Sequence, residues 1–180
     1  PDASLRYNVV AATYSAPRSP ALRPHPQFDR TIGYFKSQGS IANCAGDENT
    51  IPDRSTTFKC APPIRGKANQ DKLWEGLREG VIDFIVSDHS PCVPQLKCFD
   101  SGNFHEAWGG ISSLQLGISS VWEQAQRRGF TQRDLARWMS TGPAQFIGRG
   151  GTLGRLAPGY CANMVVWDPE CAFEVTAEHL

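Results

Sequence analysis

Residues 87–91, Ser-Asp-His-Ser-Pro, place a carboxylate and an imidazole side by side directly after an apolar run. The run, residues 81–86, has the composition of a strand covered on both faces, and catalytic groups collect at the C-terminal ends of such strands. Asp88 could be an oxygen ligand for a divalent metal and a base for a metal-bound water. Alternatively, Asp88 caps the following turn and His89 is a polar loop residue. The spacing leaves both interpretations open.

The six cysteines are scattered, with no C-x-x-C pair. Cys92 and Cys98 flank a short loop and could contribute to a metal site, but two further ligands at finger spacing are lacking. We therefore interpret them as loop thiols. Cysteine usage of this kind is typical of a reduced compartment, and we expect a cytoplasmic protein.

A strand, a helix and a second strand are predicted in succession before the Asp88 loop. Residues 56–60 read as a strand ended by two prolines. Within 69–79, Leu73, Trp74 and Leu77 recur at helical spacing, and Gly80 stands where a left-handed cap is usual. With residues 81–86 as the next strand, the order predicts a parallel βαβ unit.

Three helices are expected after a loop that ends near Gly110. The first has a long apolar face and ends at Gly129; the face consists of Ile111, Leu114, Ile118, Val121, Trp122 and Ala125. Thr131, with Asp134 three residues later, is typical of a capped start for the second. Pro143 can begin a third, short helix.

The two ends of the chain differ from this regular middle. Residues 163–167 predict a strand after a turn, and Phe173 and Val175 suggest another, in a small separate β unit. Residues 1–46 interleave prolines with arginines and sustain no periodicity, so we expect poor order there. A proline-rich arm for a partner is conceivable, but its P-x-x-P spacing arises easily by chance.

Charge and hydropathy argue against two classes of partner. Lys and Arg total 18, as do Asp and Glu, so no net field attracts nucleic acid or anionic membrane. No uninterrupted apolar run reaches the roughly 18 residues of a membrane span. We therefore expect neither nucleic-acid binding nor membrane insertion.

Several separated motifs are similar to one known family. They are residues 58–65 (Phe-Lys-Cys-Ala-Pro-Pro-Ile-Arg), 69–70 (Asn-Gln), 83–92 (Asp-Phe-Ile-Val-Ser-Asp-His-Ser-Pro-Cys), 107–111 (Ala-Trp-Gly-Gly-Ile), 156–160 (Leu-Ala-Pro-Gly-Tyr) and 165–168 (Val-Val-Trp-Asp). Over about residues 49 to 180 the chain resembles the allantoinases of the cyclic amidohydrolase family. The cysteine after the lysine, the Asp-His-Ser-Pro-Cys loop and the Ala-Trp-Gly-Gly turn favour allantoinases over dihydroorotases and hydantoinases.

The resemblance implies an α/β fold: the C-terminal part of a (β/α)8 TIM barrel and part of a small β-sandwich. The chain would divide into an irregular, unmatched leader (1–48), the barrel part (49–150) and the sandwich part (151–180). It also implies two zinc ions bridged by a carboxylated lysine, hydrolysis of the ring amide of allantoin to allantoate in purine catabolism, and a homo-oligomer. The partner would be this small-molecule substrate.

The same resemblance implies roles for individual residues. Residues 56–60 and 81–87 would be barrel strands seven and eight. Asp88 matches the last metal ligand and catalytic base, and His89 a substrate contact. The ring pocket would be lined by the backbone around Cys60, Ala61, Trp108 and Gly109.

The chain also departs from the family pattern. The family has a His-x-His, a lysine and two further histidines as ligands, whereas residues 1–48 contain only His25. We therefore expect an incomplete chain with little or no activity, its helix faces exposed for lack of strands; these are Leu73, Trp74, Ile111, Leu114, Val121 and Trp122. The alternatives are a non-catalytic interaction protein of the same fold and a related hydantoinase or dihydroorotase.

Overall fold

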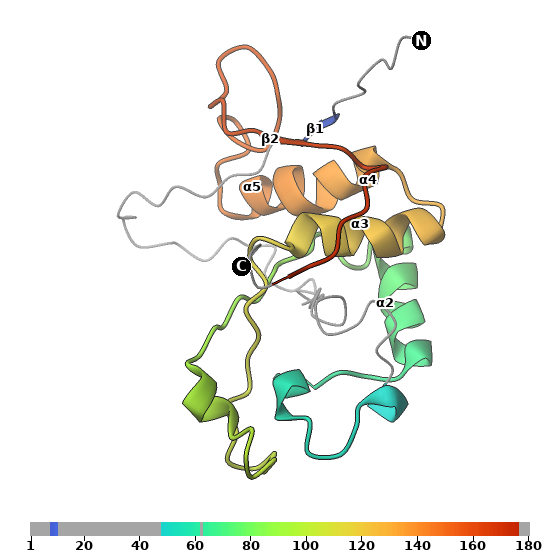
Figure 1. Ribbon diagram of the computed structural model, residues 1–180. Helices are drawn as coiled ribbons and strands as arrows, with labels where there is room; N and C mark the ends of the chain where they lie inside the picture. The colour runs from blue at the N-terminus through green and yellow to red at the C-terminus, as the bar shows by residue number, and fades with distance from the viewer. Residues whose placement is uncertain (1–7, 11–47, 62, 177–180) are drawn as a thin grey trace, which may run out of the picture.

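The computed structural model describes residues 8–10, 48–61 and 63–176. The chain there divides into a helical half and a half built from loops (Figure 1). Its helices are α2 (Lys67–Glu79), α3 (Gly117–Arg127), α4 (Gln132–Ala136) and α5 (Gly142–Phe146), with a π-helical turn, η4 (Arg137–Thr141), joining the last two. Single 3-10 turns are η1 (Glu48–Thr50), η2 (Thr56–Phe58) and η3 (Pro94–Lys97). Of residues 1–46, for which poor order was expected, the structure describes only 8–10, and these form a paired strand, β1 (Asn8–Val10). The rest of that expectation lies outside the described residues.

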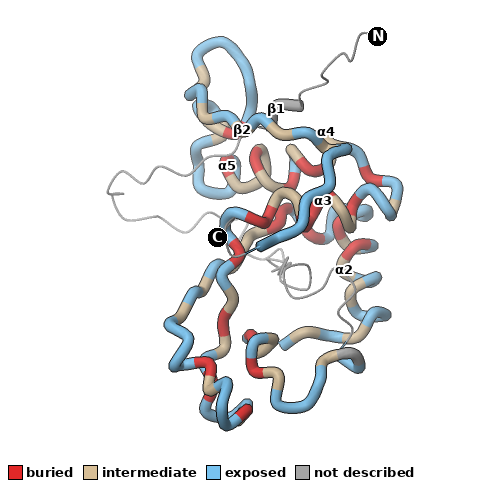
Figure 2. The backbone as a smooth tube through the Cα atoms, in the orientation of Figure 1, coloured by how far each residue is buried: buried red, intermediate tan, exposed pale blue. Residues whose placement is uncertain are grey.

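A core of aromatic and aliphatic side chains holds the helical half together (Figure 2). Its buried members are Trp74, Leu77, Ile82, Ile85, Val121, Trp122, Ala125, Phe130, Leu135 and Trp138. The rings of Phe130 and Trp138 pack edge to face with centroids 4.8 Å apart, a geometry that adds to the gain from burial. The helices thus bury their apolar faces against one another.

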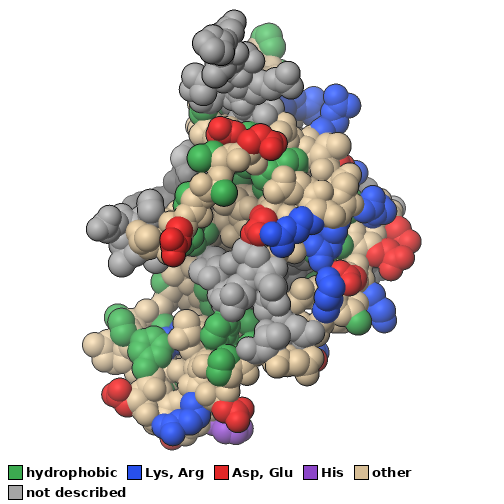
Figure 3. All heavy atoms as spheres, turned by 45° about the vertical axis from the view of Figure 1, so that its right-hand side comes forward, with side chains coloured by type: hydrophobic (Ala, Val, Ile, Leu, Met, Phe, Trp, Pro, Cys, Tyr) green, Lys and Arg blue, Asp and Glu red, His purple; other side chains and the backbone are tan. Residues whose placement is uncertain are grey.

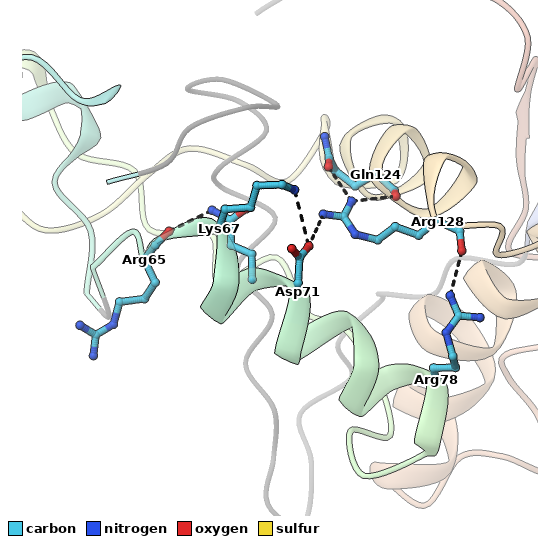
Figure 4. A network of polar contacts seen from close by, with 7 residues as sticks. Arg65, Lys67, Asp71, Arg78, Gln124 and Arg128 are labelled. Atoms are coloured by element: carbon cyan, nitrogen blue, oxygen red, sulfur yellow. Dashed lines mark hydrogen bonds and ion pairs between the residues drawn. The ribbon is translucent and has the colours of Figure 1, made fainter. Parts of the chain in front are cut away.

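Polar contacts tie α2 to α3 at the rim of this core (Figure 4). Asp71 accepts a hydrogen bond from the Arg128 guanidinium at 3.1 Å and pairs with Lys67 at 3.6 Å. Arg78 donates to the carbonyl oxygen of Arg128 at 2.8 Å. Because Lys67, Asp71 and Arg78 are exposed, these contacts add little to the stability of the fold.

The helix signals read from the sequence are confirmed where they are local. Gly80 caps α2 with a left-handed φ of 72°. Thr131 and Asp134 form the reciprocal capping box of α4, and Pro143 stands in the first turn of α5. Each signal concerns groups within four residues of one another, so it does not depend on the rest of the fold.

Both strands predicted around α2 are absent from the described residues. Residues 56–58 form the 3-10 turn η2, and residues 81–86 are buried at Ile82, Phe84 and Ile85 without entering a ladder. The amide of Ile85 instead donates to the carbonyl of Trp138 at 3.0 Å. A strand exists only through hydrogen bonds to a neighbouring strand, and neither segment has one here. The βαβ prediction is therefore wrong for this structure.

The helix predicted from Ile111 begins later, at Gly117. The amides of Ser113 and Leu114 are bonded to the His89 imidazole, which holds residues 113 and 114 outside the helix. The exposure predicted for the helix faces is wrong for Trp74, Val121 and Trp122, which are buried, and confirmed for Leu114, which is 68% exposed. Leu73 and Ile111 are half-buried.

One strand pair is present in the described residues. Strand β2 (Val165–Trp167) lies within the predicted residues 163–167 and pairs antiparallel with β1 (Asn8–Val10), Val9 opposite Val166. The strand suggested at Phe173 and Val175 is not formed; both residues are exposed and outside any ladder. No helix of the described residues is long and apolar enough to cross a membrane.

Candidate functional site

The residues predicted to do chemistry lie in the loop half of the structure. Residues 48–61 and the middle of the long loop 87–116 lie in the lower part of Figure 1, below the helices. Hydrogen bonds join the two segments. The Arg54 guanidinium donates to the carbonyl oxygen of Asp100 at 3.1 Å, and the Lys59 ammonium donates to that of His105 at 3.3 Å. The two segments therefore form one unit.

Asp88 lies at a turn in the backbone where the buried run ends. Its φ is +47°, a left-handed conformation that aspartate adopts more readily than most residues. The Ser90 hydroxyl donates to the Asp88 carbonyl oxygen at 3.3 Å. Asp88 is half-buried and stands where the buried run passes into the loop.

His89 ties the two ends of the long loop together. Its Nδ1 accepts hydrogen bonds from the backbone N–H groups of Ser113 at 3.0 Å and Leu114 at 3.1 Å. Since Nδ1 accepts, the proton of the neutral ring is on Nε2. The Ser113 hydroxyl donates to the carbonyl of Ser87 at 2.9 Å, which closes the same junction.

Ser90 and Gly110 meet at close range next to this junction. The Ser90 amide donates to the carbonyl of Ile111 at 3.0 Å, and the Ile111 amide to the Ser90 hydroxyl at 3.3 Å. A Cβ at Gly110 would stand 2.5 Å from Ser90 Oγ and closer still to its carbonyl oxygen. Glycine is required here because any side chain would collide with backbone.

The four predicted ring-lining residues come from two segments that the structure brings together. A Cβ at Gly109 would lie 3.8 Å from both the Cβ and the amide nitrogen of Ala61. Cys60 is buried, whereas Ala61 and Trp108 are exposed. The Trp108 amide donates to the carbonyl of Leu96 at 2.7 Å, which anchors the turn.

Lys97 is a residue of this site that sequence reasoning missed. It is buried, 8% exposed, and its ammonium donates to the carbonyl oxygens of Lys59 at 3.0 Å and Gly110 at 2.5 Å. Burial lowers its pKa below the usual lysine value, opposed by the nearby Cys92 and Cys60 and supported by Lys59. Nothing in the Pro-Gln-Leu-Lys sequence around it signals burial.

A complete metal site is not formed by the part of the chain that the structure describes. No group of three or more His, Cys, Asp or Glu side chains there could hold an ion. Cys92 and Cys98 are free thiols. Of the residues in this loop, Asp88 is the one that the sequence pattern proposes as a metal ligand, and it could supply a single ligand.

Comparison with known proteins places this chain in a family. The sequence model of the Amidohydrolase family matches residues 35–179. The chain belongs to the amidohydrolase family. The match begins before residue 48, where the leader was expected to end. Amidohydrolases are typically metal-dependent, and the family resemblance seen in the sequence is confirmed.

Among relatives, this amidohydrolase chain is similar to several allantoinases. It is 47% identical over 129 residues to a probable allantoinase of Oryza sativa subsp. japonica and 46% identical over 129 residues to an allantoinase of Arabidopsis thaliana. Each alignment covers 72% of this chain and 25% of the relative. The chain therefore spans about a quarter of the length of the curated relatives it matches.

Solved structures agree on the fold. A D-hydantoinase from a Bacillus sp. AR9 matches with a TM-score of 0.67 and 25% identity, over 76% of this chain and 31% of that one. A D-hydantoinase (dihydropyrimidinase) from Thermus sp. matches with a TM-score of 0.61 and 25% identity, over 70% of this chain and 28% of that one. Family and structural likeness together imply a TIM-barrel-type fold.

Proposed function

We propose that this chain is part of an allantoinase, which hydrolyses the ring amide of allantoin to allantoate in purine catabolism. The observation that carries the proposal is the 47% identity over 129 residues to a probable allantoinase. A stretch of that length in a chain of 180 residues necessarily includes the Asp88 loop. The substrate is a small cyclic amide, and the protein is proposed to be cytoplasmic and homo-oligomeric.

Within the fold, residues 49–150 are proposed to supply the last part of the TIM barrel and residues 151–180 part of a β-sandwich. Ile82, Phe84 and Ile85 are buried, and the Asp88 loop follows them directly, which supports this placement. In a closed barrel, loops at the C-terminal ends of the strands form the active site. Residues 1–48 remain assigned to a leader, of which the family match includes the last part.

Asp88 is proposed as the catalytic acid–base group. Its carboxylate takes a proton from the attacking water and delivers it to the ring nitrogen as the amide bond breaks. His89 is proposed to contact substrate: with Nδ1 occupied by two amides, its Nε2–H is the side able to donate to a ring carbonyl. Backbone groups of Cys60, Ala61, Trp108 and Gly109 would line the ring pocket.

Zinc is the proposed metal, as two ions bridged by a carboxylated lysine. The described residues do not fit such a centre by themselves, because no group of three or more His, Cys, Asp or Glu side chains among them, Asp88 included, could hold an ion. The remaining ligands would have to come from outside the described residues.

A chimaera tests the proposal. Residues 49–180 replace the matching quarter of the Arabidopsis thaliana allantoinase, and allantoate release, hydantoin and dihydroorotate hydrolysis and zinc content are measured. Allantoinase activity is expected, with kcat falling at least ~10²-fold in Asp88→Asn and little in Asp100→Asn, an exposed carboxylate of the same loop.

Two results would overturn the proposal. A folded, zinc-loaded chimaera that hydrolyses only hydantoin or dihydroorotate would assign the loops to a different cyclic amide. A folded chimaera with no hydrolytic activity would favour a non-catalytic interaction protein. Full activity in Asp88→Asn would remove that residue from its role while leaving the substrate assignment in place.

A further inference from the structure

Lys97 joins two segments that are far apart in the sequence. One of its carbonyl partners, Lys59, precedes the Cys60–Ala61 segment, and the other, Gly110, follows the Trp108–Gly109 turn. The same side chain therefore contacts the backbone on both sides of the proposed ring pocket. A Cβ added at Gly109, the neighbour of Gly110, would be in van der Waals contact with Ala61, so the two segments lie side by side there.

A buried ammonium at position 97 carries a cost in free energy. Burying a charge costs free energy unless hydrogen bonds replace the lost water, and an unbranched apolar side chain of similar length, such as methionine, would avoid that cost. The lowered pKa of Lys97, caused first by its burial, indicates that the surroundings disfavour the charged form relative to water. Burial of apolar surface therefore does not explain why a lysine occupies the site, whereas the two carbonyls that it satisfies can.

The hydrogen-bonding geometry of the ammonium explains better why a lysine occupies position 97. A lysine ammonium has three N–H donors and rotates freely, so it can bond to two carbonyls from different segments at once. Hydrogen bonds from a charged donor are shorter and stronger than neutral ones. Such a link fixes the separation of the two backbones without requiring a strand pairing between them.

We propose that Lys97 is a positioning residue that holds the 59–61 and 108–110 backbones at the spacing a flat cyclic amide needs. The part of this statement that concerns substrate rests on the proposed function. The part that concerns the two backbones does not, and it can be measured on the chain itself. Lys97 touches no reacting atom in this role and acts through the carbonyls it holds.

The first test measures amide hydrogen exchange in the 180-residue chain. Lys97→Met removes the donors and keeps the length, Lys97→Arg keeps the charge and donors, and Lys72→Met removes a charge from an exposed position on α2. We expect Lys97→Met to speed exchange at Lys59, Trp108 and Ile111 by about tenfold or more, with α3 unchanged. Lys97→Arg should restore most of the protection, and Lys72→Met should match the parent.

A purely structural role predicts a different pattern. Faster exchange in α3 and the core by the same factor, or no change at the loop amides, would overturn the proposal. If Lys97→Met does not fold, Lys97→Gln, which keeps an N–H donor without charge, takes its place. Partial protection of both segments in Lys97→Gln is then expected, and loss confined to one segment would contradict a link between them.

The second test separates positioning from chemistry in the chimaera. Lys97→Met is expected to raise KM for allantoin about tenfold while kcat changes less, because substrate-lining backbones move and Asp88 does not; Lys97→Arg should recover KM. A fall in kcat with unchanged KM would overturn the substrate part of the proposal. An inactive parent chimaera would count against the proposed function alone, since the exchange experiment reports on Lys97 independently.

Discussion

The Nδ1 atom of His89 accepts hydrogen bonds from the backbone amides of Ser113 and Leu114, at 3.0 and 3.1 Å. These amides come just before α3, so the imidazole joins the end of the buried run to the approach of that helix. The two amides therefore set the tautomer of the imidazole, and the imidazole in turn sets the path of the loop. The backbone at Ser113 and Leu114 thus holds His89, the proposed substrate contact, in place.

Replacing His89 should loosen this junction. In His89→Ala the two amides lose their acceptor, and we expect their exchange to accelerate several-fold while exchange within α4 stays constant. His105→Ala removes an exposed histidine from the same loop and is the matched control. Equal acceleration in both variants would show that the imidazole contact does not order the junction. Exchange resolved by NMR at Ser113 and Leu114 makes the comparison direct.

The two adjacent glycines of the turn should respond differently to the same added methyl group. A Cβ at Gly109 meets Ala61 at 3.8 Å, an ordinary contact, whereas one at Gly110 collides with the Ser90 backbone. Gly109→Ala should therefore fold normally, and Gly110→Ala should lose ~1–3 kcal/mol through the forced shift. Urea unfolding of both variants checks this. Equal stability would mean that Ser90 and Gly110 do not approach as described.

Stability of the helical half should depend on its own core. Leu77 is fully buried, and Leu77→Ala should lower the free energy of unfolding by ~2–5 kcal/mol. Leu114→Ala, at an exposed leucine, should change it by less than ~0.5 kcal/mol. Thermal unfolding monitored by tryptophan fluorescence reports this core directly, because Trp74 and Trp138 lie in it. Similar losses in the two variants would argue against a helical core formed by this chain.

The structure shows which parts of a fold one sequence can predict. Gly80, Thr131 and Pro143 each signal a helix boundary through bonds to near neighbours, and each prediction is confirmed. Ile111 and Leu114 have helical spacing but lie outside α3, because the distant Ser90 and His89 side chains bind amides in that stretch. Local pattern does not reveal such competition.

As with the helix boundaries, part of the candidate site could be predicted from the sequence. Asp88 and His89 are marked by their position after an apolar run, and motif resemblance points to Ala61 and Gly109 as neighbours. Lys97 could not be found, because a lysine in a proline-containing loop reads as a solvated side chain. Its burial follows from the meeting of two segments far apart in the sequence, which no spacing encodes.

The capping box of α4 should make stability depend on pH in a specific way. Burial raises the pKa of the Asp134 carboxyl, but the Thr131 amide at 2.9 Å and hydroxyl at 2.7 Å, with Arg137 and Arg78, outweigh it, so the net pKa lies below 3.8. A carboxyl whose pKa is lower in the folded state stabilises the fold above its unfolded pKa, and this contribution disappears as pH falls through the folded value.

Asp134→Asn removes that titration, so its cost should be present at pH 7, at ~0.5–2 kcal/mol, and should shrink as pH falls below 3.8. Urea unfolding at a series of pH values from 7 to 3 measures the difference between parent and variant. Thr131→Ala removes the hydroxyl that bonds both ways and should reproduce much of the loss at pH 7, whereas Asp100→Asn, in the exposed loop, should not. A cost for Asp134→Asn that stays constant across this range would mean that the carboxylate charge does not contribute to the cap, because only the ionised form carries the pH-dependent part.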